Sequence, residues 1–472
     1  MVVKKGKYYQ LIFNILLFAL GNIGSKFIVF ILMPLYTNEL TTTEYGISEL
    51  VITGTNLLIP FASISIQDAT LRFALDKKNN SGEVLKNTTF ILALGSILTC
   101  LLFPLIKLYG AIADWSVYFL AISIVYMIRN AFSIYLKAIG KTKLYALDSI
   151  LYTMLLMITS ILFLTVFKMG LKGYFLAIII STSASIVILS VFGDVIHCCS
   201  TSSINKNLMK EMVSFSLPMI LNNVSWWIIN SLDKVMVEYF VSVAASGIYS
   251  VASKIPSVLT TLTNIFNQAW IISSVSEYDT TKEGNFYSKT FAVFSCILII
   301  FASGIVLIIK SFMQIYVGDS FVESWQYVPI LLLGSIFQSY ATFFGAIYTS
   351  AKKNVSVMTT TLLAAGINFI LNIILIPQIG VQGAVIATAI SYFTVFAFRM
   401  LDSQRYMKFH INYKKLIASL VILTCQSVLM ITDANENSYI ESIFCFTLLL
   451  IINFNTFKEL IIMINNKMIH KK

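Results

Sequence analysis

Two stretches of the chain carry the same pattern of small residues. Residues 166–181 read VFKMGLKGYFLAIIIS, and residues 376–391 read IPQIGVQGAVIATAIS. At an offset of 210 residues, the matched positions are Gly170, Gly173, Ala177 and Ser181 with Gly380, Gly383, Ala387 and Ser391. A pattern that returns at a fixed distance along a chain indicates a duplicated structural unit.

Other matches extend the repeat toward the N-terminus. The same offset pairs Trp115 with Trp325 and Lys143 with Lys353, and an offset of 201 pairs Gly46 with Gly247. Apolar sequences match easily, so coincidence is the alternative explanation of any one pair. The shared order of the pairs favours duplication.

The composition is that of a membrane protein. Hydrophobic residues make up 57% of the chain, charged residues only 12%, and the mean hydropathy is +0.83. A soluble domain carries roughly 25% charged residues. The chain also lacks any long polar block, so we expect one integral membrane domain rather than several soluble ones.

A membrane-spanning helix needs about 20 mostly apolar residues. Fourteen segments qualify: 11–35, 46–66, 88–108, 115–137, 144–167, 173–193, 213–234, 246–272, 290–309, 328–350, 355–376, 383–401, 416–432 and 440–460. Six spans, an even number, separate the two copies, so both copies have the same orientation, as in a parallel repeat. The predicted fold is all-α: two six-helix bundles (1–200 and 201–410), then two additional helices and a basic tail (411–472).

The distribution of basic residues predicts the orientation, because Lys and Arg concentrate in cytoplasmic connections. With the N-terminus inside, 25 of the 33 Lys and Arg residues fall on the inner side and five at outer span ends. Both termini are therefore expected in the cytoplasm, with the first apolar run retained as a span. This topology accounts for the net charge of +11, and we expect no nucleic-acid partner.

Nothing in the sequence predicts an enzyme, a cofactor or a metal site. The six cysteines show no ligand spacing, and His197-Cys198-Cys199 is better explained as a loop in a reducing cytoplasm than as a metal fragment. Gly140-Lys141-Thr142 resembles part of a phosphate loop, but Tyr135 stands where that motif requires glycine. A membrane glycosyltransferase or polymerase would bring an Asp-rich metal site or a large catalytic loop, and neither is present.

Several motifs together resemble the multidrug/oligosaccharidyl-lipid/polysaccharide exporter superfamily, and within it the bacterial polysaccharide flippases. They are Glu44-Tyr45-Gly46, the run Gln67-Asp68-Ala69-Thr70-Leu71-Arg72-Phe73, Leu232-Asp233-Lys234, and the run from Gly247 to Pro256. The resemblance covers essentially the whole chain. It implies a flippase that moves undecaprenyl-diphosphate-linked oligosaccharides across a bacterial cytoplasmic membrane for O-antigen, lipopolysaccharide or capsule, with membrane lipids and a polymerase complex as further candidate partners.

Polar residues follow one face of the second and eighth spans. The spacing of three or four residues puts them in a stripe on each helix. The stripes are Glu49, Thr53, Asn56, Pro60, Ser63 and Gln67, and then Ser246, Ser250, Ser253, Ser257, Thr260, Asn264 and Gln268. We expect them to line a hydrated cleft between the bundles; the alternative is that the hydroxyls only ease helix packing.

Three cations lie within predicted spans, namely Lys26, Arg129 and Lys254. A charge at bilayer depth costs at least ~2.5–3.5 kcal/mol, so each needs a water-filled or protein-lined setting. We predict that they bind the diphosphate of the substrate, because phosphate oxygens accept charge-assisted hydrogen bonds. The alternative is a structural ion pair, such as Lys254 with Glu49 or Arg129 with Asp148.

A second transporter class stays open. A multidrug or cation antiporter of the same superfamily would use buried carboxylates to hold Na⁺ or H⁺, and Glu49 and Asp233 could serve this purpose. We therefore treat Glu49, Asp233, Asn56, Asn264 and Gln268 as candidate coupling or cavity residues. For either class the predicted mechanism is alternating access around the repeat.

Overall fold

All regular structure that the computed structural model describes is helical. It describes residue 28 and residues 30–76, 78–280, 284–351, 353–432 and 437–469. The predicted all-α fold class is confirmed for these ranges. By its contacts the chain divides into two compact units, Met1–Leu232 and Asp233–Lys472.

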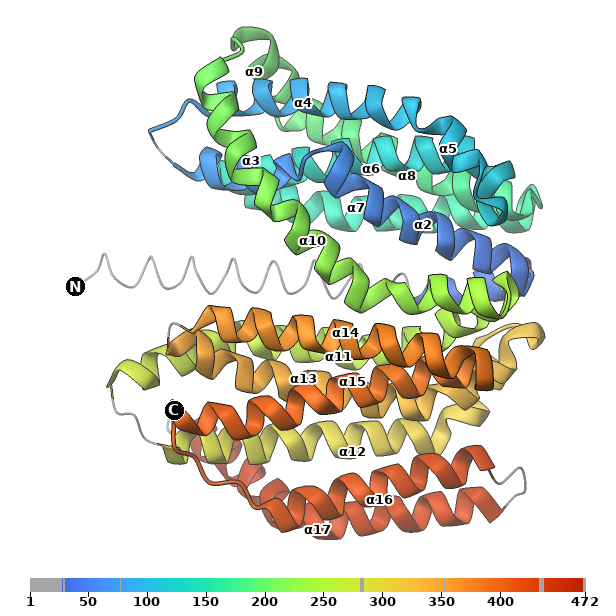
Figure 1. Ribbon diagram of the computed structural model, residues 1–472, viewed down its shortest axis with the longest axis vertical. Coiled ribbons are helices and arrows are strands. Elements are labelled where there is room, and N and C mark those ends of the chain that lie inside the picture. Colours follow the sequence, from blue (N-terminus) through green and yellow to red (C-terminus); the bar gives the residue numbers. More distant parts are fainter. Residues whose placement is uncertain are drawn as a thin grey trace. The chain divides into compact units, whose positions relative to one another are not determined.

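The N-terminal unit contains the helices drawn in blue to green in Figure 1. They are α2 (Thr42–Ala62), α3 (Ile66–Leu75), α4 (Ser81–Leu101), α5 (Phe103–Lys107), η1 (Gly110–Trp115), α6 (Ser116–Ala138), α7 (Thr142–Ile161), the π-helical turn η2 (Leu162–Val166), α8 (Gly170–Phe192), α9 (Val195–Thr201) and the first part of α10 (Lys206–Phe240). Helix α6 packs on α3, α4 and α8, and α8 also packs on α7.

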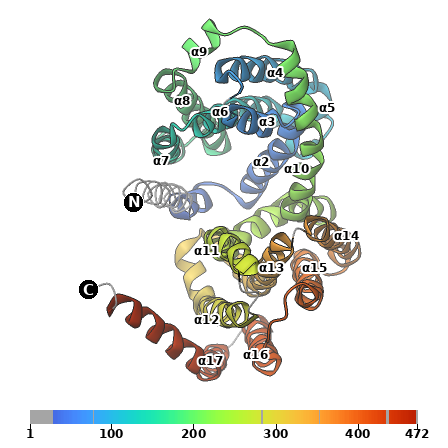
Figure 2. The ribbon, with the colours of Figure 1, turned by 90° about the vertical axis from the view of Figure 1, so that its left-hand side faces the viewer.

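The C-terminal unit contains the end of α10 and the remaining helices. They are α11 (Val243–Thr280), α12 (Gly284–Tyr316), η3 (Asp319–Tyr327), α13 (Val328–Ser350), α14 (Asn354–Ile379), α15 (Val381–Asp402), η4 (Ser403–Arg405), α16 (Tyr413–Thr432) and α17 (Asn437–Ile469). Helix α13 lies between α11 and α15 (Figure 2), and α16 and α17 pack together on α12.

The described part of the chain holds eleven helices that are long and apolar enough to cross a membrane, or twelve when the bent pair α2 and α3 counts as one span. Each predicted span from the second to the fourteenth overlaps one or two of the helices above, and α11, on the eighth, is not among the eleven. Most of the first, 11–35, lies outside the described residues, so the count of fourteen stays a prediction. The division into 1–200, 201–410 and 411–472 also stays a prediction.

The glycines of the repeat serve the same purpose in both units. Gly170 and Gly380 have φ angles of +54° and +62°, in the region that favours glycine, at the turns before α8 and α15. A Cβ on Gly173 would lie 3.0 Å from the carbonyl oxygen of Phe163, and one on Gly383 would lie 2.5 Å from that of Leu375. Each pair therefore makes a tight turn and lets two consecutive helices approach closely.

The second span is broken after Pro60. A proline within a helix removes a backbone donor and weakens the turn around it. Ile64 and Ser65 have φ angles of +52° and +50°, and α2 and α3 meet there at an angle of 58°. The carbonyl oxygen of Ile59 accepts from both the backbone N–H (2.9 Å) and the Oγ (2.7 Å) of Ser63, which holds the end of α2.

Side chains of α10 form hydrogen bonds to residues on both sides of this break. Asn223 Nδ2 donates to Ser65 Oγ (3.1 Å) and to Asp68 Oδ2 (3.1 Å). One turn further, Trp227 Nε1 donates to the carbonyl oxygen of Thr53 (2.8 Å). The first part of α10 is therefore bound to both halves of the second span.

We expect Gly95→Ala to destabilise the N-terminal unit. A Cβ at Gly95 would lie 2.2 Å from the carbonyl oxygen of Ala62, so α4 would have to move away from the end of α2. Overpacking of this kind costs about 1–3 kcal/mol, which should lower the thermal unfolding midpoint of the purified protein. Gly366→Ala is the matched control, because a Cβ there meets no atom within 4 Å; equal midpoints for the two variants would contradict the expectation.

Candidate functional site

Arg129 forms an ion pair inside the N-terminal unit. Its Nη2 lies 2.8 Å from Oδ2 of Asp148, whose side chain is fully buried, and its Nε donates to Ser185 Oγ (2.7 Å). Ser185 in turn donates to the other carboxylate oxygen of Asp148, and the guanidinium lies 3.9 Å from the centre of the Tyr152 ring. The pair therefore ties α6, α7 and α8 together, which is the alternative that the sequence left open for Arg129.

The same geometry leaves part of the guanidinium free of protein acceptors. An arginine has five N–H groups, and within the described residues two of those of Arg129 are used, one by Asp148 and one by Ser185. The side chain is 21% exposed. Asp148 thus holds Arg129 in place while other N–H groups stay available to an anion.

In the C-terminal unit, Asp233 of α10 is buried among neutral donors. It accepts hydrogen bonds from Tyr249 Oη (3.0 Å), Thr388 Oγ1 (2.6 Å) and Asn372 Nδ2 (2.5 Å). Asn368 extends the group, because its amide contacts Thr388 (3.3 Å) and its oxygen accepts from Asn372 (3.0 Å). We call these five residues the Asp233 cluster.

The Asp233 cluster has the chemistry of a site for a small hard cation. Asp233 is only 6% exposed and makes no ion pair with any described residue, although a buried charge ordinarily needs a partner. Asn372 Oδ1 is buried with no hydrogen-bond donor among the described residues. Carboxylate, amide and hydroxyl oxygens are the ligands that hard cations prefer, and a single carboxylate suits a monovalent ion or a proton.

The remaining candidate residues differ in their burial. Glu49 is buried in α2 and accepts a hydrogen bond from Tyr45 Oη (3.0 Å), and Lys254 is half-buried in α11. Asn56, Asn264 and Gln268 are exposed, and Lys26 lies outside the described residues. Arg129 and Lys254 belong to different units, so their meeting at one diphosphate stays a prediction.

The two polar stripes differ in their exposure. In α2, most of the stripe is buried, and only Asn56 is exposed. In α11, the stripe is buried at Ser246 and Ser250 but exposed at Ser257, Asn264 and Gln268. The stripe of α2 therefore contributes mainly to packing inside its unit, whereas the second half of α11 presents polar groups at the surface.

Arg399, at the inner end of the predicted span 383–401, is one of the 25 basic residues counted on the cytoplasmic side. It is instead 6% exposed within α15, where neutral oxygens satisfy it. Its acceptors are Thr360 Oγ1 (2.9 Å), Thr361 Oγ1 (2.8 Å) and the carbonyl oxygens of Ala341 and Val357 (3.0 Å each). Arg399 thus ties α13, α14 and α15 together, as the Arg129 pair ties α6, α7 and α8.

Lys141, from the stretch that resembles a phosphate loop, has a structural partner at the surface. Its Nζ lies 2.7 Å from Asp194 Oδ2 and donates to the carbonyl oxygen of Gly193 (3.1 Å). The hydrogen bond and the nearby charge of Lys141 hold the pKa of the Asp194 carboxyl below its usual value. Lys141 therefore links the start of α7 to the turn after α8.

Of the partners of Asp233, sequence reasoning found none. Asn372 and Thr388 lie 139 and 155 residues away along the chain, and one sequence gives no sign that they meet. One local signal was available: Asn368 and Asn372 are two amides one turn apart in a strongly apolar helix. Amides at bilayer depth are costly and generally functional or packed against polar partners.

Comparison with known proteins assigns the family. Residues 11–274 match the family described as polysaccharide biosynthesis protein, which is more than half of the chain. The chain belongs to this family. The family predicted from the sequence motifs is thereby confirmed.

A curated relative matches over a shorter range. It is a probable low-salt glycan biosynthesis flippase, Agl15, of Haloferax volcanii, with 26% identity over 191 residues. The match covers 39% of this chain and 39% of that protein. The chain thus matches well under half the length of this relative.

Solved structures share the fold. The lipid II flippase MurJ, in an inward closed conformation, matches with a TM-score of 0.71 over 95% of this chain and all of that one, at 13% identity. An inward-facing MATE family multidrug resistance transporter matches with a TM-score of 0.60 over 82% of this chain and 94% of that one, at 14% identity. At such identities the likeness is one of fold: a multi-pass helical transporter fold.

Proposed function

We propose that this protein is a flippase that moves a lipid-linked oligosaccharide across the cytoplasmic membrane for assembly of a surface polysaccharide. The observation that carries the proposal is membership of the polysaccharide biosynthesis family over residues 11–274. The fold shared with a lipid II flippase over nearly the whole chain supports it. The substrate that we propose is an undecaprenyl-diphosphate-linked repeat unit, taken from the inner leaflet and released outside by alternating access.

The diphosphate is assigned to Lys26, Arg129 and Lys254. For Arg129, two observations support this: its side chain is partly exposed, and some of its N–H groups have no acceptor in the described part of the chain. These groups can donate to a phosphate while Asp148 keeps the side chain in place. Lys254 is half-buried in a helix whose second half carries exposed polar groups. A cation held at membrane depth by its own unit is positioned to attract an anion that must leave water.

We expect Lys254→Ala and Lys26→Ala to slow flipping without impairing membrane insertion. A hydrogen bond to a charged group contributes about 1.5–3 kcal/mol, so each loss should weaken substrate binding about ten- to hundredfold. The measurement is the rate at which a fluorescent undecaprenyl-diphosphate oligosaccharide becomes accessible to an external quencher in vesicles with the purified protein. Lys353→Ala, in the exposed connection before α14, is the control; wild-type rates for both test variants would refute the assignment.

A second candidate function is cation-coupled export of small cationic molecules. The fold shared with a MATE transporter and the buried carboxylate of Asp233 favour it. The two functions separate in one experiment, in which the same vesicles are offered the lipid-linked oligosaccharide or a cationic dye. Dye export without lipid flipping would replace the flippase proposal, and lipid flipping that the dye does not inhibit would support it.

A further inference from the structure

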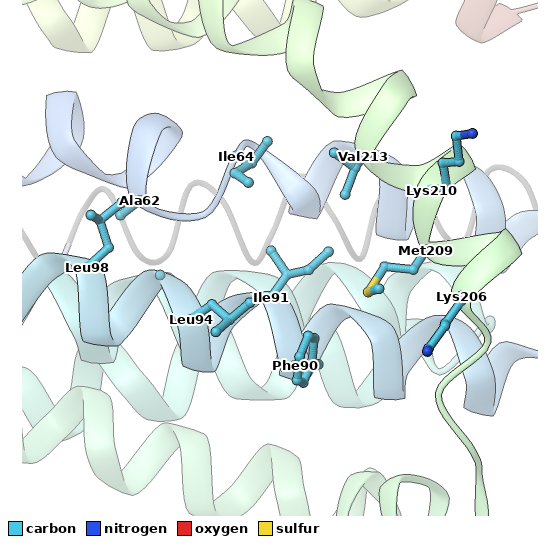
Figure 3. A pocket seen from close by; sticks show the side chains of 11 residues that line it. Ala62, Ile64, Phe90, Ile91, Leu94, Leu98, Lys206, Met209, Lys210 and Val213 are labelled. Carbon is cyan, nitrogen blue, oxygen red and sulfur yellow. The ribbon is translucent and has the colours of Figure 1, made fainter.

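The N-terminal unit has a long apolar groove between α4 and α10 that no part of the proposed transport reaction uses. Its volume is about 540 Å³. Figure 3 shows its lining, which comes from the end of α2, the break after it, one face of α4 and the first turns of α10. The lining residues are Ala62, Ile64, Phe90, Ile91, Leu94, Gly95, Leu98, Lys206, Met209, Lys210 and Val213.

Charge is confined to one end of this groove. Lys206 and Lys210 lie at one end of the row of side chains in Figure 3, and Ala62 and Leu98 lie at the other. The two lysines are four residues apart on α10; in Figure 3 the side chain of Lys206 points toward Phe90, and that of Lys210 points the opposite way. Both are exposed, and neither forms an ion pair with a carboxylate in the described ranges. The two ammonium groups therefore remain available to a ligand.

The protein holds the lysine end of the groove in a fixed position against α4. Asn87, fully buried in α4, donates to the carbonyl oxygen of Asn205 (2.9 Å) and accepts from its backbone N–H (3.2 Å). The side chain of Asn205 donates to Glu83 of α4 (2.8 Å). Leu208 and Met212 are buried in the hydrophobic core of the unit. The first turn of α10, which carries Lys206 and Lys210, is therefore held against α4 by hydrogen bonds to the backbone and the side chain of Asn205.

The walls of the groove are suited to an acyl chain. Helices α4 and α10 are both long and apolar enough to span a membrane, and Phe90, Leu94 and Leu98 are 40–52% exposed along one side of α4. An apolar groove of this size is a poor site for water, which needs polar partners. From Phe90 to Leu98 the groove follows α4 for about 12 Å, at 1.5 Å per residue, which accommodates the upper part of a lipid tail.

We propose that this groove is a binding site for one anionic phospholipid of the inner leaflet. The phosphate contacts Lys206, Lys210 adds positive charge at the same end of the groove, and one acyl chain lies along Phe90, Leu94 and Leu98. The lysines fall on the predicted cytoplasmic side, where anionic lipids attract clustered basic residues and basic pockets between helices bind lipid headgroups. The proposal depends on that orientation and does not depend on the flippase function, so either one can fail without the other.

The experiment is a lipid titration of the purified full-length protein, followed by native mass spectrometry. Phosphatidylglycerol and phosphatidylcholine with identical acyl chains are compared, so that only the headgroup charge differs. About 1 kcal/mol for each of two lysines corresponds to a preference of about thirtyfold for phosphatidylglycerol. The double variant Lys206→Gln/Lys210→Gln should lose this preference, whereas Lys289→Gln/Lys353→Gln, with two exposed lysines of the C-terminal unit, should keep it.

A second pair of variants tests the apolar part of the groove. Leu94→Trp fills it and should reduce the binding of both lipids, while Val187→Trp, at a position that is 60% exposed on α8, should not. Equal affinity of the wild-type protein for the two lipids would overturn the proposal, as would a preference that survives Lys206→Gln/Lys210→Gln. If undecaprenyl diphosphate displaces phosphatidylglycerol at equimolar concentration, the groove belongs to the transported lipid, and the assignment to a phospholipid is wrong.

Discussion

Replacing Asp148 by alanine is expected to destabilise the protein by about 3 kcal/mol, the lower end of the cost of breaking a buried ion pair. The lower end applies because the Arg129 side chain is 21% exposed, whereas that of Asp148 is fully buried. Without the carboxylate, the guanidinium keeps its charge but loses its partner, and Ser185 loses its acceptor. The thermal unfolding midpoint in detergent should fall accordingly.

Two companion variants separate the structural contribution of the pair from substrate binding. Arg129→Leu/Asp148→Leu removes both charges, and the replacement of a buried pair by apolar residues is often neutral or stabilising. If Arg129 binds the diphosphate, this double variant should unfold near the wild-type temperature and yet flip lipid slowly. A double variant with normal stability and normal flipping would mean that Arg129 only ties helices together.

Asp233→Asn is expected to remove the dependence of transport on a cation gradient. The substitution keeps a side chain of the same shape in the Asp233 cluster but removes its negative charge. Coupling between two sites is typically worth 1–3 kcal/mol, or about 5- to 150-fold. The rate of gradient-driven transport should therefore decrease by about 5- to 150-fold. The measurement is flipping in vesicles with an imposed Na⁺ gradient or pH gradient, applied separately, which also identifies the ion.

The controls for Asp233 use its own neighbours and a distant carboxylate. Tyr249→Phe removes one hydrogen-bond donor but keeps the charge, so its response to the gradient should be weakened and not abolished. Asp194→Asn changes an exposed carboxylate paired with Lys141 and should leave transport unchanged. A gradient response of wild-type size in Asp233→Asn would exclude the Asp233 cluster as the coupling site.

The sequence predicted the parts of the fold that depend on local pattern. Apolar runs located the helices, and the paired glycines indicated the repeat. The positive φ of Gly170 and Gly380, which glycine readily adopts, is known only from the structure. The break in the second span was not predicted. The residue spacing places Pro60 in a polar stripe. A proline followed closely by Ser63 and Ser65 is also a signal for a break in a helix.

What the sequence could not supply is the pairing of distant polar groups. Arg129 with Asp148 was one open alternative, but the contribution of Ser185 from α8 required the fold. Arg399 was counted with the cytoplasmic basic residues because a cation in the last turn of a helix is usually solvated, whereas here α13 and α14 bring carbonyl and hydroxyl oxygens to it. Such contacts depend on which helices pack side by side, and periodicity within one helix carries no information about its neighbours.

The position of the boundary between the two units has a practical consequence for dissecting the protein. Leu232 and Asp233 are adjacent residues of the uninterrupted helix α10. A gene split at that point would place Asn223 and Trp227 on one polypeptide and Asp233 on the other. Each polypeptide would carry only part of α10, with a new helix end at the cut. Two fragments for co-expression are better divided between α9 and α10. The whole of α10 then belongs to the C-terminal fragment.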